Sequence, residues 1–151
     1  MKKYLSIIVS FFIIFTSLTG CGGGVKTTDV SKPAEGVDLD LAALSSVMIY
    51  AEMNNIKAAP DSYLGKTIRA RGTYSAFYAE ETGRYHQFII TYLDPTACCT
   101  ELIEFSWKGS HKYPDDYPAE GAKIELTGVL EAYAVPGQIL YRLAVDDITV
   151  L

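Results

Sequence analysis

Hydrophobic positions recur along this 151-residue chain with two different periods, and each period predicts a different element. In residues 41–55 they come three and four apart, which is typical of an amphipathic α-helix. The apolar stripe consists of Leu41, Leu44, Val47, Met48 and Ala51. We expect Asp38 or Asp40 to cap the start of this helix, and Asn54 and Asn55 to end it. A helix this short is marginal alone, so its stripe is expected to pack on another element.

From residue 66 onward, apolar and polar residues alternate, which is typical of half-buried β-strands. Five strands are predicted, at residues 66–79, 85–93, 99–107, 123–134 and 138–145, with another extended piece at 148–151. In the first strand, the residues expected on one face are Ile68, Ala70, Gly72 and Tyr74. Residues 108–122 contain two prolines and two glycines and are predicted to be loop.

Two of these strands have a glycine near the centre, Gly72 in the first and Gly128 in the fourth. A glycine inside a strand marks a bulge or a sharp bend. Bent, half-buried strands favour a small closed barrel, because closure removes the exposed edges that a small sheet must otherwise protect. We therefore expect a mainly β fold, a small five-stranded barrel preceded by one N-terminal α-helix. A β-sandwich is the alternative.

The sequences GKTIRARGTYSAFY, EGAKIELTGVLEAY and YRLAVDDITVL resemble those of OB-fold proteins, and the resemblance covers residues 63–151. It implies an OB-like barrel. The OB-fold usually places a helix between its third and fourth strands, whereas the corresponding residues here, 108–122, are rich in proline and glycine. The helix of this chain is instead expected to precede the barrel.

The N-terminus has the three parts of a bacterial secretion signal. Two lysines, Lys2 and Lys3, precede an uncharged, mainly apolar run over residues 4–18, which is shorter than the roughly 20 residues of a spanning helix. The tetrad LTGC, which ends at Cys21, resembles the bacterial lipobox. That resemblance implies a diacylglyceryl group on the Cys21 thiol and cleavage just before Cys21. The alternative is an ordinary signal peptide with a cysteine near its end.

A glycine run and a polar tract follow Cys21 and are typical of a flexible linker. We therefore expect a lipoprotein signal peptide at residues 1–20, a lipidated flexible linker at 21–37, and the OB-like barrel domain with its N-terminal helix at 38–151. Stable anchoring takes two acyl chains, which a diacyl group supplies. The expected location is the extracytoplasmic face of the cell membrane, which the protein contacts through its lipid.

The charge of the chain excludes one class of partner. The signal contains two of the 13 basic residues and none of the 18 acidic ones, so the mature chain has 11 basic residues and a formal charge of −7. Proteins that bind polyanions normally have an excess of basic residues, because neutralising phosphates supplies most of their affinity. Nucleic acid and anionic lipid headgroups are therefore not expected partners.

Two cysteines remain after Cys21, and Cys98 and Cys99 are adjacent, so a turn just before them would allow both thiols to face one metal ion. His86, expected on the paired strand, is the first candidate co-ligand. The other candidates are Glu101, Glu104 and His111. Thiolate and imidazole together suit zinc or cuprous copper. The alternatives are a strained vicinal disulfide, a redox-responsive pair, and thiols that only pack in the structure.

The segments VMIYAEMNNIKAAPDSYLGKTIRARGTY and DPTACCTELIEF resemble uncharacterised membrane lipoproteins of Gram-positive bacteria, with an OB-like extracytoplasmic domain that carries a Cys-Cys pair. The resemblance implies no particular activity. The chain also has no Gly-x-Ser-x-Gly elbow and no marked acid/base couple. We therefore expect no enzymatic activity.

The function expected from these features is that of a binding module anchored on the outer face of the membrane. Its sharper form binds zinc through Cys98, Cys99 and His86. The alternative is a protein-interaction or scaffold module of a cell-envelope complex, with an envelope protein as partner and no metal.

Overall fold

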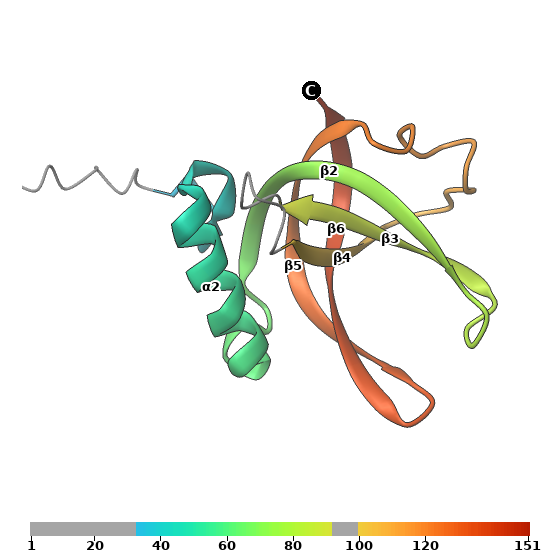
Figure 1. Ribbon diagram of the computed structural model, residues 1–151, viewed down its shortest axis with the longest axis horizontal. Coiled ribbons are helices and arrows are strands. Elements are labelled where there is room, and N and C mark those ends of the chain that lie inside the picture. The colour runs from blue at the N-terminus through green and yellow to red at the C-terminus, as the bar shows by residue number, and fades with distance from the viewer. Residues whose placement is uncertain (1–32, 92–99) are drawn as a thin grey trace, which may run out of the picture.

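The computed structural model describes residues 33–91 and 100–151, and Figure 1 shows its ribbon. Within these ranges the protein is mainly β, with one α-helix and a six-stranded mixed sheet. The strands are β1 (Leu39–Asp40), β2 (Thr67–Ala79), β3 (Arg84–Thr91), β4 (Glu101–Trp107), β5 (Lys123–Val135) and β6 (Gln138–Val150). The helices are α2 (Ser46–Ala58) and the short 3-10 turns η1 (Leu41–Ala43) and η2 (Pro60–Tyr63).

Strand pairing around the sheet returns to β2. The strand order is β1-β2-β3-β4-β6-β5, and β2 also pairs with β5. β1 pairs with β2 and β4 with β6 in parallel, whereas the other neighbouring strands are antiparallel. Each of β2 to β6 therefore has a neighbour on both sides over part of its length. Figure 1 shows β2, β5 and β6 as long, strongly curved strands, with α2 to one side of them.

The alternation in β2 places its apolar side chains inside, as predicted. Ile68, Ala70 and Tyr74 are each at most 1% exposed. They share a core with buried residues of the other long strands, including Ile89, Phe105, Ile124, Leu143 and Val145. Leu41 of η1 belongs to the same core, so the segment before the first long strand is packed on the sheet.

Both mid-strand glycines lie where another backbone comes too close for a side chain. A Cβ added at Gly72 would lie 2.8 Å from the carbonyl carbon of Ile90, and one at Gly128 would lie 2.8 Å from the carbonyl oxygen of Ala144. The predicted bulge is confirmed beside Gly128, where the register of β5 against β6 shifts. The close approach of the neighbouring strand therefore requires glycine at both positions.

β6 is one continuous strand, so the prediction of two separate extended pieces, 138–145 and 148–151, is wrong. At the register shift beside Gly128, one residue of β5 lies opposite two residues of β6, Asp146 and Asp147. This is the geometry of a β-bulge. The bulge interrupts the apolar alternation of β6, and this interruption is what resembles a turn in the sequence.

The helix begins and ends later than predicted. α2 starts at Ser46 with Ser45 in the N-cap position, and η1 occupies the predicted first turn. Asp38 and Asp40 do not cap the helix, because both carboxylates accept hydrogen bonds from β2 instead. At its other end the helix continues three residues beyond the predicted end, to Ala58.

The predicted apolar stripe is not the face through which α2 packs. The helix buries Met53 and Ile56. Val47 and Met48 of the stripe are 76% and 47% exposed, and Leu41 is buried in η1 rather than in the helix. Because α2 is apolar at two sets of helical positions, spacing alone does not decide which set faces the sheet.

The long connection before β5 agrees with the sequence pattern, but the structure contains one strand that the pattern does not predict. Residues 108–122 form turns and contain no helix, as predicted. β1 is not predicted by the pattern, and it raises the number of strands in the described residues from five to six. With two residues paired to β2, this strand is too short for alternation to reveal it.

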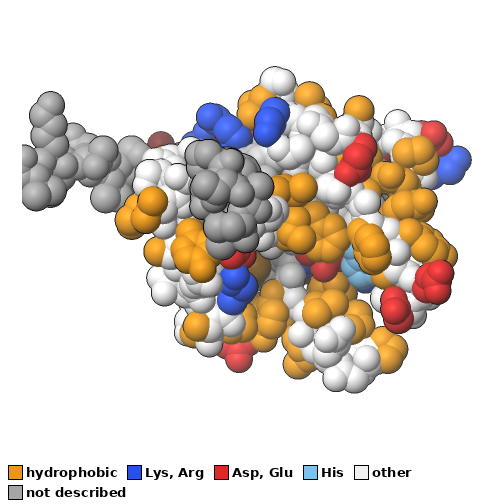
Figure 2. All heavy atoms as spheres, in the orientation of Figure 1, with side chains coloured by type: hydrophobic (Ala, Val, Ile, Leu, Met, Phe, Trp, Pro, Cys, Tyr) orange, Lys and Arg blue, Asp and Glu red, His pale blue; other side chains and the backbone are white. Residues whose placement is uncertain are grey.

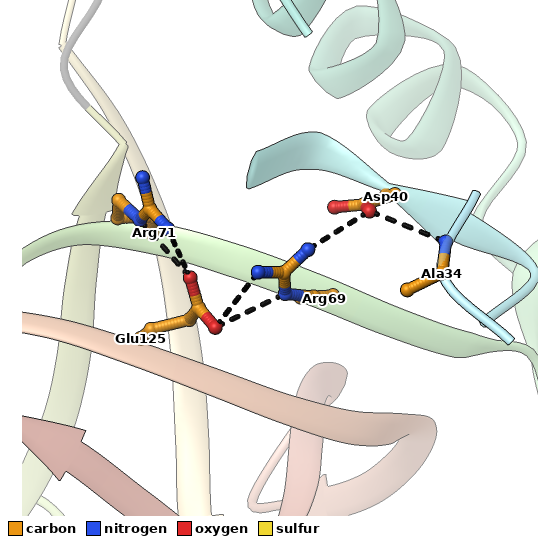
Figure 3. Close-up of polar contacts among 5 residues, drawn as sticks. All are labelled: Ala34, Asp40, Arg69, Arg71 and Glu125. Carbon is orange, nitrogen blue, oxygen red and sulfur yellow. Dashed lines mark hydrogen bonds and ion pairs between the residues drawn. The ribbon is translucent and has the colours of Figure 1, made fainter. Parts of the chain in front are cut away.

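An ion-pair network joins β1 to β2 and β5 (Figure 3). Arg69 Nη1 lies 3.1 Å from Asp40 Oδ2, and Arg69 Nη2 lies 3.0 Å from Glu125 Oε1. Arg71 Nη2 lies 2.6 Å from Glu125 Oε2, and Asp40 Oδ2 also accepts a hydrogen bond from the amide of Ala34. Because Asp40 is only 6% exposed, its carboxylate depends on Arg69 for charge compensation.

Acid is expected to weaken this network through Glu125. Burial raises the pKa of Glu125, but the hydrogen bonds and positive charges of Arg71 and Arg69 outweigh burial and hold the pKa below its ordinary value of 4.5. A carboxylate whose pKa is lowered by folding stabilises the fold above its unfolded-state pKa, and this contribution is lost as the pH falls through the folded-state pKa. As the pH is lowered below about 5, the free energy of unfolding of Glu125→Gln, measured by urea titration, should therefore fall less steeply than that of the wild type.

The control for this prediction is Asp115→Asn, which removes a carboxylate that is 65% exposed. Its pH profile should stay close to that of the wild type. An equal change in both profiles would contradict the role given to Glu125.

Candidate functional site

A cavity of about 660 Å³ lies between the β2–β3 turn and the β5–β6 hairpin. Its apolar lining residues are Ala79, Phe88, Val135, Pro136 and Leu140. Its polar lining residues are Glu81, Thr82, His86, Glu104 and Gln138. This volume, and an apolar surface with a few converging polar groups, are typical of small-molecule sites. The cavity is therefore the candidate functional site.

Two tight turns and a pair of strands place these side chains. Gly83 and Gly137 have φ angles of 64° and 84°, which glycine adopts readily, so both hairpins turn tightly. In the wall between the turns, Phe88 of β3 pairs with Glu104 of β4. His86 shares the face of Phe88, because side chains alternate along a strand. Figure 1 shows both hairpins extending toward the lower right of the view, away from α2.

His86 is buried at the cavity wall and is 7% exposed. Its Nδ1 lies 2.8 Å from Glu104 Oε1, and its Nε2 lies 2.8 Å from Thr82 Oγ1. The Tyr133 hydroxyl donates a hydrogen bond of 2.6 Å to the other carboxylate oxygen, Glu104 Oε2. One carboxylate therefore joins side chains of β3, β4 and β5.

Tyr133 is a permanent hydrogen-bond donor to Glu104 at physiological pH. Burial of the ring, the hydrogen bond to Glu104 and the negative charge of that carboxylate together raise the pKa of Tyr133 to about 12. Arg142 lies over the same ring, with its Cζ 4.5 Å from the ring centroid. The Glu104 carboxylate is thus held from both sides, by Tyr133 on one oxygen and by His86 on the other.

Aromatic side chains lie on both faces of the β2–β3 hairpin. Phe77 is directly opposite His86 in the strand register, so the two side chains are on the same face of the sheet. Phe77 is 64% exposed. On the other face, Tyr78 and Tyr85 pack edge to face, with ring centroids 5.2 Å apart. The exposed Phe77 ring is suited to contact an apolar face of a ligand.

The predicted zinc site stays a prediction. Cys98 and Cys99 lie outside the described residues, as does the predicted lipidation site, Cys21. Both ring nitrogens of His86 are hydrogen-bonded to protein groups, so metal binding there requires one of these bonds to break. Within residues 33–91 and 100–151, no group of three His, Cys, Asp or Glu side chains is placed to hold a metal ion.

The structure brings one of the other candidate co-ligands to His86 and places the other two elsewhere. Glu104 contacts His86 directly. Glu101 forms an ion pair with Lys57 of α2, with 2.7 Å between Lys57 Nζ and Glu101 Oε1. His111 stacks on the chain's one tryptophan, with ring centroids 3.7 Å apart. Of the candidate co-ligands in the described residues, Glu104 is therefore in contact with His86, whereas Glu101 and His111 are engaged elsewhere.

Sequence patterns identify His86 and Glu104 as candidates but not the network that joins them. Glu104 is 18 residues from His86 and 29 residues from Tyr133. Alternation predicts which residues of one strand share a face, but it does not give the register between strands. The register is what places Tyr133 and Glu104 within hydrogen-bonding distance.

Comparison with protein families, with curated proteins and with solved structures finds no match for this chain. In the part of the chain that the structure describes, none of the helices has both the length and the apolar character needed to cross a bilayer. The function is therefore inferred from the cavity and from the sequence features.

Proposed function

We propose that this chain is an extracytoplasmic lipoprotein, anchored to the cell membrane through Cys21, whose OB-like barrel binds a small ligand in the cavity beside His86. The barrel interpretation is supported by the pairing of β2 with both β3 and β5, since a sheet that closes on itself is the basis of a barrel. The long strands β2 to β6 are then the five barrel strands, and β1 is an addition to them.

The position of the cavity is the observation that carries this proposal. OB-folds bind ligands on the face of their second and third strands and at the loops that join strands one to two and four to five. In this chain those elements are β3, β4, the β2–β3 turn and the β5–β6 turn. Together with the adjoining ends of β2, β5 and β6, they supply all the lining residues.

The lining favours an uncharged or cationic ligand. Glu81 and Glu104 contribute two carboxylates, and the mature chain has a formal charge of −7, so anions are repelled. Thr82 and Gln138 add hydrogen-bonding groups, and Phe77 offers an exposed ring on the same side of the sheet as His86. Sugars and amino sugars combine hydroxyl and amine donors with an apolar ring face. Oligosaccharides are therefore the proposed ligand class.

The proposed role is binding rather than catalysis. Both oxygens of Glu104 and both ring nitrogens of His86 are bonded to protein groups. A general acid or base must instead reach the proton that it transfers to or from a substrate. In this proposal the two residues fix the shape of the cavity wall and orient its polar groups.

Replacing Glu81 with glutamine is expected to weaken binding of a glucosamine tetramer about fivefold, because a charge-assisted hydrogen bond contributes about 1 kcal/mol more than a neutral one. Calorimetric titration of the full chain measures this change. Glu80→Gln is the matched control, since Glu80 is in the same turn but is not among the lining residues. Equal effects of the two substitutions, or tighter binding of polyphosphate than of the amino sugar, would contradict the proposed ligand class.

Cells that express Cys21→Ser are expected to incorporate no labelled palmitate into this protein, because the thiol that receives the lipid is missing. Cys98→Ser is the control and should be labelled as strongly as the wild type. Intact-mass analysis of the wild type should show loss of residues 1–20 and the added mass of a diacylglyceryl group. Retention of those residues, or labelling of Cys21→Ser, would refute the lipid anchor.

A further inference from the structure

α2 has a second apolar face, opposite the face that packs on the sheet. The helix packs inward through Met53 and Ile56. With 3.6 residues per turn, Val47, Ala51 and Ala58 lie on the opposite side of the helix, and all three are exposed. Figure 2 shows hydrophobic side chains gathered on the surface over α2, at the left of the view.

This outer face of α2, centred on Val47, Ala51 and Ala58, contains no charged residue. Its polar members are two asparagines, and its edges are Met48 and Tyr50, which are 47% and 43% exposed. The two charged side chains of the helix, Glu52 and Lys57, lie to either side of this face. Because a helix face in contact with water normally carries charges, this composition indicates a face that another surface covers.

The chain that leads to the proposed lipid enters beside this helix. The described part begins at Pro33, and Figure 1 shows the chain from there running next to α2. Pro33 is twelve positions after Cys21 in the sequence. The flexible linker predicted from the sequence would span about 20 Å on average over these twelve positions. A lipid on Cys21 would therefore hold the domain with α2 close to the bilayer.

We propose that the outer face of α2 lies on the surface of the membrane in which Cys21 is anchored, with Val47 and Met48 at the boundary between the lipid headgroups and the acyl chains. This inference rests on the proposed lipid anchor. Interfacial helices bury an apolar face at the boundary between headgroups and acyl chains. A tyrosine at the edge of that face, such as Tyr50, suits this boundary because its ring is apolar and its hydroxyl is polar.

The charged residues of α2 itself do not oppose this contact. The two charges of α2 have opposite signs, and Lys57 is paired with Glu101 at 2.7 Å. The two hairpins that frame the cavity extend away from α2 (Figure 1). Contact of α2 with the membrane would thus direct these hairpins outward, where a ligand outside the cell reaches them.

Fluorescence quenching in vesicles tests this orientation. The acylated full chain with Tyr50→Trp is placed in phosphatidylglycerol–phosphatidylcholine vesicles that contain lipids brominated near the headgroup end of the acyl chain. After subtraction of the wild-type signal, which comes from Trp107, we expect the bromolipid to remove most of the emission of the introduced tryptophan. Phe77→Trp is the matched control, because Phe77 is also exposed but lies on the β2–β3 hairpin. Its emission should persist, and equal quenching of the two variants would overturn the proposal.

Flotation of the same vesicles distinguishes failure of the lipid anchor from failure of the proposed orientation. If the chain does not float with the vesicles, the lipid anchor fails, and the orientation fails with it. If it floats and Tyr50→Trp is not quenched, the anchor stands and the orientation is overturned.

A second variant and a second quencher complete the test. This variant combines Val47→Asp and Met48→Asp with Tyr50→Trp. Its quenching by bromolipid should fall to the level of Phe77→Trp. Both positions are exposed, so these changes leave the core intact. Protection of the introduced tryptophan from aqueous iodide without bromolipid quenching would mean that a protein covers this face, and it would overturn the proposal.

Discussion

Replacing Gly72 with alanine is expected to lower the free energy of unfolding by about 3 kcal/mol. The added Cβ would lie 2.8 Å from the carbonyl carbon of Ile90 and closer still to its oxygen. Because these are main-chain atoms of β3, no side-chain rotation relieves the clash, and β2 and β3 have to move apart. Urea denaturation followed by circular dichroism measures the loss.

Gly83→Ala is the control for loss of a glycine as such. Gly83 has a φ of 64°, but no atom of the described residues comes within 4 Å of an added Cβ. This variant should therefore lose only the backbone strain of about 1 kcal/mol. If Gly72→Ala loses no more stability than Gly83→Ala, the close approach of β2 and β3 is not what requires glycine at position 72.

Replacing Glu104 with alanine is expected to destabilise the protein by a similar amount, about 3 kcal/mol. The substitution leaves the buried imidazole of His86 and the Tyr133 hydroxyl without their shared acceptor. Glu104 and His86 are 11% and 7% exposed at their side chains, so water does not readily replace the carboxylate. The same urea titration gives the size of the effect.

The matched control on the same strand is Glu101→Ala. The Glu101 side chain is also 11% exposed, but its partner Lys57 is 53% exposed and can be hydrated when the pair is lost. The expected loss is therefore only about 1 kcal/mol. Equal losses at the two positions would show that the His86–Glu104–Tyr133 network adds no stability beyond that of an ion pair with an exposed partner.

The strands could be predicted from the sequence because their side chains alternate between a buried and an exposed face. This held for β2, where Ile68, Ala70 and Tyr74 are buried as expected. Alternation failed in β6, where the bulge at Asp146 and Asp147 changes which face the following residues occupy. A bulge depends on pairing with a partner strand, so the pattern of one strand alone does not reveal it.

The packing face of α2 could not be predicted for a different reason. The helix has apolar residues at two sets of positions, one centred on Met53 and Ile56 and one that includes Val47 and Met48. Helical spacing is equally regular in both. Which set is buried is decided by packing against the sheet, where Met53 and Ile56 join the core, and helical spacing carries no information about that contact.

For the candidate site, the sequence supplied residues but not their arrangement. His86 and Glu104 stand out because they are ionisable residues in strands. Tyr133, one of eleven tyrosines, carries no local signal of its role. The cavity itself depends on two hairpin turns that lie more than fifty residues apart, at Gly83 and Gly137. Such a long-range arrangement follows from strand order, which local patterns do not determine.

The pairing of β2 with both β3 and β5 has a consequence for how neighbouring copies of the protein contact one another. Strands with unpaired edges join the edges of neighbouring molecules and aggregate. In the described part of this chain, β1 is the one strand with a single neighbour, and it contributes only two residues. If the proposed lipid anchor concentrates copies on a membrane, neighbouring molecules would meet with the middle of most long strands already paired. Shorter stretches, such as residues 131–135 of β5, pair on one side alone and are where edge-to-edge contact would occur.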